Sequence, residues 1–219
     1  MDLAAFLTKV SIAAIPIVFA ITLHEVAHGW VAKFFGDRTA EAQGRLSLNP
    51  LRHIDPIGTV LVPLLMLWLG GFLFGWAKPV PVNPRYMRNP RGNMVWVSAA
   101  GPTANLVMAV VWAFLLMLTQ RSDFGVAGDW IQQMSGIGIF INVMLAVFNM
   151  LPIPPLDGGQ VLTNLLPRGQ FSMTLERLAP YGLFVVLGLV ATGLLSPIIE
   201  PPIRALIGFL VAAFQLQLG

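Results

Sequence analysis

Cysteine is absent from the 219 residues, and only 11% of the residues are charged. The absence of cysteine excludes a disulfide framework, a thiolate metal site and a thiol nucleophile. Soluble domains carry about 25% charged residues, whereas 56% of this chain is hydrophobic. The composition therefore predicts a polytopic membrane protein. It excludes a nucleic-acid-binding protein, because basic residues in such a chain mostly mark membrane topology.

Charged residues divide the chain into long apolar stretches. A spanning helix needs about 20 apolar residues. Five stretches are candidates: Lys9–Lys33, Asp55–Lys78, Arg91–Arg121, Asp129–Asp157 and Arg177–Glu200. A final apolar stretch follows Arg204. Glu200 and Arg204 are placed at i and i+4 to pair where the final stretch begins. We predict an all-α polytopic membrane protein with about five to six transmembrane helices.

An H-E-x-x-H motif, His24-Glu25-Val26-Ala27-His28, lies inside the first apolar stretch. On a helix both imidazoles share one face and can reach one Zn²⁺, while Glu25 lies beside them to accept a proton from a metal-bound water. His28 precedes Lys33 by only about 7 Å along a helix, so the motif lies just below the membrane surface. Unpaired ionisable groups in an apolar span cost several kcal/mol, which favours a metal site over a chance match.

Catalytic zinc usually has three protein ligands and one open position, so one more ligand is expected. Asp157 is the candidate, directly after the fourth apolar stretch. Prolines before it prevent a regular helix, and glycines after it permit a sharp turn: these are Pro152, Pro154, Pro155, Gly158 and Gly159. The alternative is an interfacial loop in which Asp157 caps the following helix.

Three motifs are relevant together: His24-Glu25-x-x-His28, Gly101-Pro102-x-x-Asn105, and Asn149-x-x-Pro152 followed by Leu156-Asp157-Gly158. From about Ile12 to Leu166 the chain resembles the site-2 protease family of intramembrane zinc metalloproteases (peptidase family M50), in its short bacterial or archaeal type without PDZ or CBS domains. The resemblance implies one Zn²⁺ per chain on His24, His28 and Asp157, with Glu25 as general base. Asn105 and Asn149 match positions that orient substrate or stabilise the oxyanion, with helix–helix hydrogen bonding as the structural alternative.

The resemblance implies an intramembrane zinc endopeptidase that cleaves peptide bonds in or near transmembrane segments. It makes residues 1–219 a single membrane-embedded domain, with a catalytic core at about 5–166 and C-terminal helices at about 177–217. The expected partners are the lipid bilayer and transmembrane protein or peptide substrates, and no feature specifies an oligomeric state. The alternatives are an intramembrane metal-ion transporter, which has no special need for Glu25, and a non-catalytic binder of membrane helices.

The histidines lie near the end of the first apolar stretch, and Asp157 follows the end of the fourth. To share one metal ion, these two stretches must run in the same direction. Four consecutive spans would run them in opposite directions, so one stretch between them must turn back. Residues 56–77 are the candidate, because Gly70-Gly71 interrupts them and a proline-bounded segment continues to Val82. We predict a re-entrant hairpin with a short β element. Its exposed edge, at Phe74, Gly75, Trp76 and Ala77 and on to Val82, would pair with an unwound substrate strand; a purely structural hairpin is the alternative.

The basic residues support this hairpin. With residues 56–77 turning back, ten of the 13 Lys and Arg residues lie on one side, whereas six full spans would divide them almost equally. Basic residues concentrate on the cytoplasmic side. We therefore predict a multi-pass protein of the plasma (inner) membrane, with the zinc site toward the cytoplasmic face, the N-terminus outside and the C-terminus in the cytoplasm.

His53 lies in a polar, turn-rich segment just before this hairpin. One interpretation is a loop histidine bonded to local backbone or to Asp55. The other is a gate that caps the zinc in a resting state. If the His53→Ala variant kept its activity and its zinc, the gate interpretation would be wrong.

The hairpin can be tested by single-cysteine labelling, since the chain has no cysteine of its own. Cysteines placed at positions 80–92 should react with a membrane-impermeant thiol reagent in inverted vesicles and stay unlabelled in intact cells. Labelling of these positions from outside the cell would contradict the hairpin.

Overall fold

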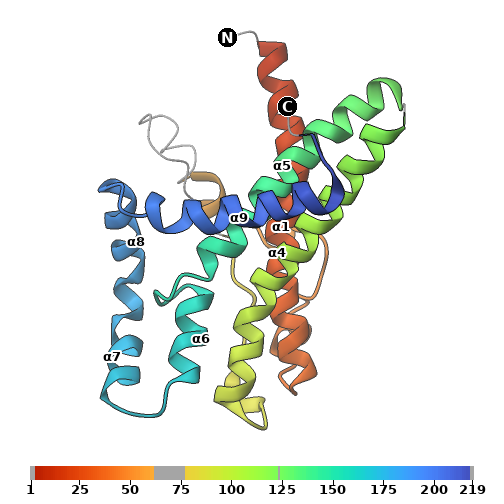
Figure 1. The fold of residues 1–219 in the computed structure, drawn as a ribbon. Coiled ribbons are helices and arrows are strands. Elements are labelled where there is room, and N and C mark those ends of the chain that lie inside the picture. Colours follow the sequence, from red (N-terminus) through yellow and green to blue (C-terminus); the bar gives the residue numbers. More distant parts are fainter. Residues whose placement is uncertain (1–2, 62–76, 123, 218–219) are drawn as a thin grey trace.

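The computed structural model describes residues 3–61, 77–122 and 124–217. These residues form helices and connecting loops, without a strand in the described ranges (Figure 1). The α-helices are α1 (Leu3–Phe34), α2 (Thr39–Ala42), α4 (Pro90–Arg121), α5 (Gly125–Asn149), α6 (Asp157–Leu165), α7 (Gln170–Leu178), α8 (Gly182–Ala191) and α9 (Ser196–Phe214). Short 3-10 helices are η1 (Pro50–Arg52), η3 (Pro84–Tyr86) and η4 (Ala179–Tyr181), and η2 (Pro56–Leu61) is a π-helix.

Five helical stretches are long and apolar enough to cross a bilayer: Ser11–Phe34, Pro90–Arg121, Gly125–Asn149, Gln170–Ala191 and Ser196–Phe214. The prediction of an all-helical, multi-pass membrane protein is confirmed at this level. The fourth of these stretches ends earlier than the charges predicted, because Gly193 adopts a left-handed φ of 72° after α8. Glu200 and Arg204 pair at 2.7 Å within α9, as predicted.

The helices α1, α4 and α5 lie side by side at the centre of the molecule (Figure 1). α1 and α4 are antiparallel: Asn105 of α4 donates to the Ala20 carbonyl, whereas Val97, two turns earlier in α4, bonds to His28. α5 follows α4 after a short turn and runs back along it. α1 and α5 therefore run in the same direction, as a metal site shared by their C-terminal ends requires.

The two ends of the stretch from His53 to Lys78 lie next to each other. The Lys78 amide donates a 2.9 Å hydrogen bond to the His53 carbonyl, so the two ends of this stretch are adjacent, as the predicted hairpin requires. Residues 62–76, which include Phe74, Gly75 and Trp76, lie outside the described residues.

The predicted β element is absent from the part of this stretch that the structure describes. Residues 77–83 have no regular secondary structure and pair with no strand among the described residues. Pro79 and Pro81 have no amide hydrogen, and the amides of Lys78 and Val80 bond to His53 and Glu25. The amides of residues 78–81 that a strand ladder would need are therefore missing or bound to loop and helix groups.

α9 lies across α4 and α5 rather than beside them (Figure 1). After α9, Gln217 exchanges two backbone–side-chain hydrogen bonds with Gln120, of 2.6 and 3.1 Å. Gln120 is at the C-terminal end of α4, which is the end of the bundle where α1 begins. The prediction that the C-terminus lies on the zinc side is corrected, because a transverse α9 does not carry the chain to that side.

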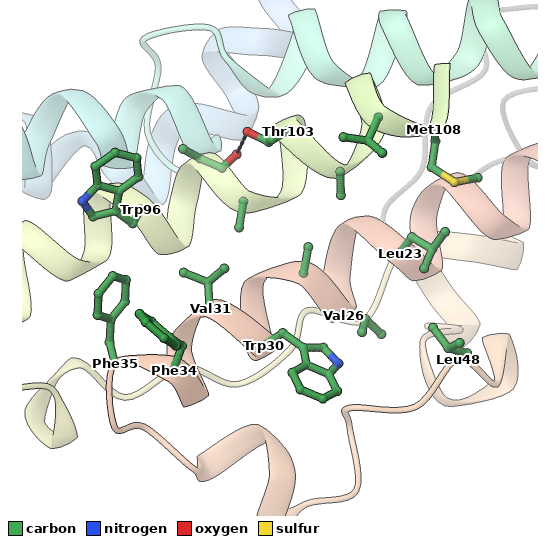
Figure 2. Close-up of a pocket in the computed structure, with 15 residues that line it drawn as sticks. Leu23, Val26, Trp30, Val31, Phe34, Phe35, Leu48, Trp96, Thr103 and Met108 are labelled. Atoms are coloured by element: carbon green, nitrogen blue, oxygen red, sulfur yellow. Dashed lines mark hydrogen bonds between the residues drawn. The ribbon is translucent and has the colours of Figure 1, made fainter. Parts of the chain in front are cut away.

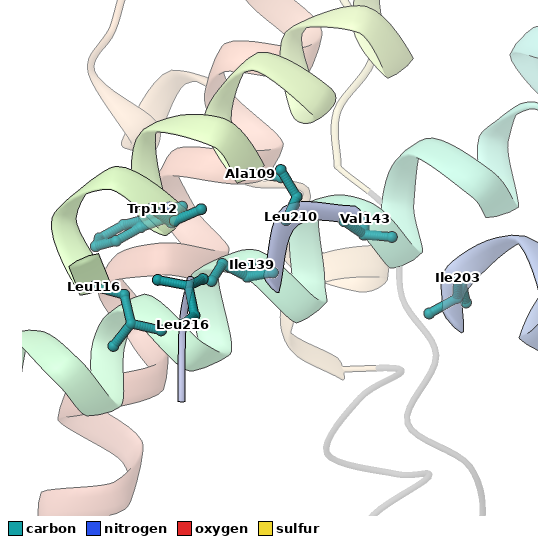
Figure 3. Packing of buried hydrophobic residues seen from close by; sticks show 9 residues of the cluster. Ala109, Trp112, Leu116, Ile139, Val143, Ile203, Leu210 and Leu216 are labelled. Atoms are coloured by element: carbon teal, nitrogen blue, oxygen red, sulfur yellow. The ribbon is translucent and has the colours of Figure 1, made fainter. Parts of the chain in front are cut away.

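Trp112 belongs to the largest buried apolar cluster of the described residues, which α4, α5 and α9 build together with Leu216 (Figure 3). Its members are Ala109, Trp112, Ala113, Leu116, Ile139, Val143, Ile203, Leu210 and Leu216. The Trp112 ring lies against Gly138 of α5, where a Cβ atom would overlap it. This glycine therefore sets how closely α4 and α5 approach.

Gly138→Ala should destabilise the protein by about 1–3 kcal/mol, because the added methyl group overpacks against the Trp112 ring. Gly136→Ala is the matched control on the same helix, since nothing lies within 4 Å of its Cβ position. The control should be neutral or slightly stabilising through helix propensity. Thermal unfolding in detergent compares the two, and equal unfolding temperatures would contradict the packing argument.

Candidate metal centre

The three predicted ligands converge between α1 and α6. His24 and His28 lie one turn apart on α1, and Asp157 is the first residue of α6. His24 Nε2 is 3.2 Å from Asp157 Oδ2, and His28 Nε2 is 3.5 Å from Asp157 Oδ1. The two Nε2 atoms are 3.1 Å apart. Ligand atoms of all three residues thus lie within 4.8 Å of one another.

Glycines bring these elements together. A Cβ atom at Gly101 would overlap His28 Nε2 and approach His24 Nε2 to 2.6 Å, so only glycine lets α4 pass so close to the imidazoles. At Gly158 and Gly159 a side chain would overlap main-chain atoms of residues 150–154. The predicted sharp turn after the prolines therefore brings Asp157 toward α1.

Hydrogen bonds determine which imidazole nitrogens face the centre. His28 Nδ1 lies 2.7 Å from the Val97 carbonyl oxygen, which can only accept, so Nδ1 carries the hydrogen. His24 Nδ1 lies 2.6 Å from Asn105 Oδ1. The nitrogen of that amide donates elsewhere, to Ala20 and Asn142, so His24 also donates through Nδ1. Both Nε2 atoms therefore direct lone pairs at the centre.

This arrangement fits a metal cation. Two imidazole lone pairs and a carboxylate that face one another repel unless a positive charge lies between them. Asp157 Oδ2 is buried without a hydrogen-bond partner, although buried polar atoms nearly always have one. Two histidines and a carboxylate, with each Nδ1–H bound to an oxygen, form a typical three-ligand catalytic zinc set.

A cavity of about 380 Å³ opens beside these ligands. Its lining comes from four parts of the chain: His24, Glu25 and His28; Pro79, Val80 and Val82; Met94, Val97 and Ser98; and Asn149, Pro155, Leu156, Asp157 and Gln160. Glu25 Oε2 accepts a 2.7 Å hydrogen bond from the Val80 amide. The predicted base therefore lies in the cavity, beside the segment of residues 77–83.

The two predicted asparagines have different placements. Asn105 is fully buried behind His24 and does not line the cavity. Its hydrogen bonds fit the helix-packing alternative and the orientation of His24, so an oxyanion role does not fit. Asn149 lines the cavity, and its Nδ2 donates to the Leu145 carbonyl at 3.0 Å.

His53 is 2% exposed, and its Nε2 lies 2.8 Å from the Ser47 carbonyl oxygen. This is the local backbone contact of the first interpretation. His53 is not among the residues that line the cavity, so the geometry gives the gate interpretation no support.

Sequence reasoning missed Asn142 and Arg45. Asn142 is fully buried in α5, accepts from Asn105 and donates to the Gly138 carbonyl. A lone amide two turns before Asn149 in an apolar stretch was the signal that could have identified it. Arg45 bonds to the carbonyls of Lys78 and Pro79, and no sequence motif marks it.

A larger hollow, of about 800 Å³, lies between α1 and α4 (Figure 2). Its lining is almost wholly hydrocarbon and aromatic, including Trp30, Phe34 and Trp96. The one hydroxyl, on Thr103, donates to the carbonyl of Ala99 in its own helix. Without a metal ligand or a base, this groove is suited to hydrocarbon contact and not to hydrolysis, despite its size.

Comparison with known proteins agrees with the site. The model of peptidase family M50 matches residues 12–127 and 125–190. "Putative zinc metalloprotease YwhC" of Bacillus subtilis is 41% identical over 194 residues, which cover 87% of this chain and 85% of the relative. "Putative zinc metalloprotease Rip2" of Mycolicibacterium smegmatis is 37% identical over 186 residues, which cover 82% of this chain and 66% of that relative. No solved structure matches. The chain belongs to peptidase family M50, the site-2 protease family of zinc metalloproteases.

Gly101→Ala should abolish stoichiometric zinc binding while the protein still folds, because the methyl group displaces both imidazoles. Gly136→Ala, the same substitution in open space on α5, should retain one zinc per chain. Metal analysis of the purified proteins measures the difference. Full zinc occupancy in Gly101→Ala would show that the ligands do not depend on this contact.

Proposed function

We propose that the protein is an intramembrane zinc endopeptidase that hydrolyses peptide bonds in or near transmembrane segments of membrane-protein substrates. One observation carries the proposal: the ligand atoms of His24, His28 and Asp157 converge on one point, beside Glu25 in a cavity. These three residues would hold one Zn²⁺ per chain, which polarises the scissile carbonyl and lowers the pKa of water toward about 7 when bound.

Glu25 is the general base in this proposal. The Val80 amide holds its Oε2, which leaves Oε1 to take a proton from the attacking water and pass it to the leaving amine. Asn149 lines the same cavity, and in this proposal its amide hydrogen-bonds the substrate or the developing oxyanion. Asn105 acts behind the site, where it fixes the His24 ring.

The substrate must present an extended strand, because a helical peptide hides each carbonyl in its own hydrogen-bond ladder. Residues 79, 80 and 82 line the cavity. Among the described residues, neither the amide nor the carbonyl of Val82 has a hydrogen-bond partner. We infer that Val82, beside the cavity, receives part of the unwound strand by main-chain pairing.

Membrane orientation follows from the basic residues. The end of the bundle that holds the metal cluster also holds the loops with most of the Lys and Arg residues, including Arg38, Arg52, Arg85 and Arg88. We propose that this end faces the cytoplasm, with the start of α1 outside. The adjacent His53 and Lys78 support a re-entrant path for residues 56–77.

Glu25→Gln should lower peptide hydrolysis by about 10²- to 10⁴-fold, because the amide cannot accept the proton, while zinc content stays at one per chain. The assay offers a panel of single-span substrates in proteoliposomes, and mass spectrometry locates the cleaved bond. Glu41→Gln, an acid outside the cavity, is the control that should retain activity. Undiminished cleavage in Glu25→Gln would contradict the base assignment. Zinc flux into the vesicles without cleavage would favour a transporter.

A further inference from the structure

Arg45 is a buried cation without a carboxylate partner among the described residues. It is 8% exposed, and none of the ion pairs in the described ranges includes it. Its Nη2 donates instead to the carbonyl oxygens of Lys78, at 2.7 Å, and Pro79, at 3.3 Å. Burying an unpaired charge is unfavourable, so an arginine held on two carbonyls calls for a physical explanation.

One peptide group connects Arg45 to Glu25. The carbonyl of Pro79 accepts from Arg45, and the amide of Val80, the other half of the same peptide group, donates to Glu25 Oε2 at 2.7 Å. A peptide dipole between a guanidinium and a carboxylate is polarised by both, which strengthens each hydrogen bond. Arg45 and Glu25 are thus linked through one peptide group.

The segment that carries this peptide is held at both ends. The Lys78 amide donates to the His53 carbonyl, and the Asn83 amide donates to Asp37 Oδ2 at 2.6 Å. Pro79 and Pro81 have no amide hydrogen. The amide that bonds to Glu25 is that of Val80, and Arg45 bonds to the carbonyl on the opposite side of that peptide group.

We propose that Arg45 is a positioning residue for the general base: it orients the Pro79–Val80 peptide so that the amide fixes the Glu25 carboxylate in the cavity. The proposal rests on the proposed function of Glu25. Arg45 is not among the residues that line the cavity, so it acts through the peptide and not on the substrate. A misplacement of about 1 Å at a reacting group can lower the rate about 10²-fold.

Amide hydrogen exchange tests the contact without relying on catalysis. Between Lys78 and Asn83 only Val80 and Val82 have an exchangeable amide, so mass spectrometry of the full-length zinc-loaded protein resolves the change. Arg45→Gln should accelerate exchange at Val80 by at least about 10-fold. Glu25→Ala should do the same, and the double variant should exchange no faster than the faster single variant. Unchanged exchange at Val80 in Arg45→Gln would overturn the proposal.

Arg52→Gln is the matched control, because Arg52 is an exposed arginine of the same loop that donates to the Gly44 carbonyl. It should leave exchange at Val80 unchanged, and a change equal to that of Arg45→Gln would also count against the proposal. If Arg45→Gln fails to fold, Arg45→Lys keeps the charge with a single-point donor. It should then give an exchange rate at Val80 between wild type and Glu25→Ala.

Turnover separates positioning from mere support of the fold. With a single-span substrate that the wild type cleaves, Arg45→Gln should lower kcat about 10- to 100-fold, with KM and zinc content within about twofold of wild type. Arg45→Lys should recover most of the loss. Parallel loss of zinc, or equal losses in both variants, would show that Arg45 only supports the fold. Absence of cleavage by the wild type would refute the proposed function, while the exchange measurement would still decide the role of Arg45.

Discussion

The approach of α4 to α1 at Gly101 is the contact on which the site depends. It lets the two imidazoles pass over α4 and places Asn105 one turn later, where its oxygen fixes the His24 ring. Asn142 of α5 in turn holds the Asn105 amide. In a bilayer no hydrophobic force draws helices together, so small residues and amide hydrogen bonds supply the packing. Here those same residues also orient a metal ligand.

The ligands could be predicted from the sequence, because an i, i+4 histidine pair and a lone aspartate stand out in a chain with so little charge. The roles of the asparagines could not be separated in the same way. Asn105 and Asn149 are both amides in apolar helices, and spacing along one helix does not say whether a side chain meets a cavity or a neighbouring helix. Tertiary contact decides it: Asn105 bonds to α1 and α5, whereas Asn149 lines the cavity.

Other features have no local signature. The count of apolar residues identified α9 as a possible span, but composition fixes length and not direction, which packing against neighbours sets. In the sequence, Arg45 is simply one of the ten basic residues predicted on the cytoplasmic side of the membrane. Its guanidinium is buried on carbonyls more than 30 positions away in the chain, a contact that no periodic pattern encodes.

α1 has to satisfy two environments at once. Leu23, Val26 and Trp30 border the apolar groove, while His24, Glu25 and His28 line the polar cavity. Polar groups at this depth cannot rely on bulk water for hydrogen bonds. Each ionisable side chain of the motif accordingly has a protein partner: Asn105, the Val80 amide and the Val97 carbonyl. Scarcity of charge and preorganisation of the site are therefore two consequences of one constraint, because a group that the bilayer penalises is retained only where the fold fixes it.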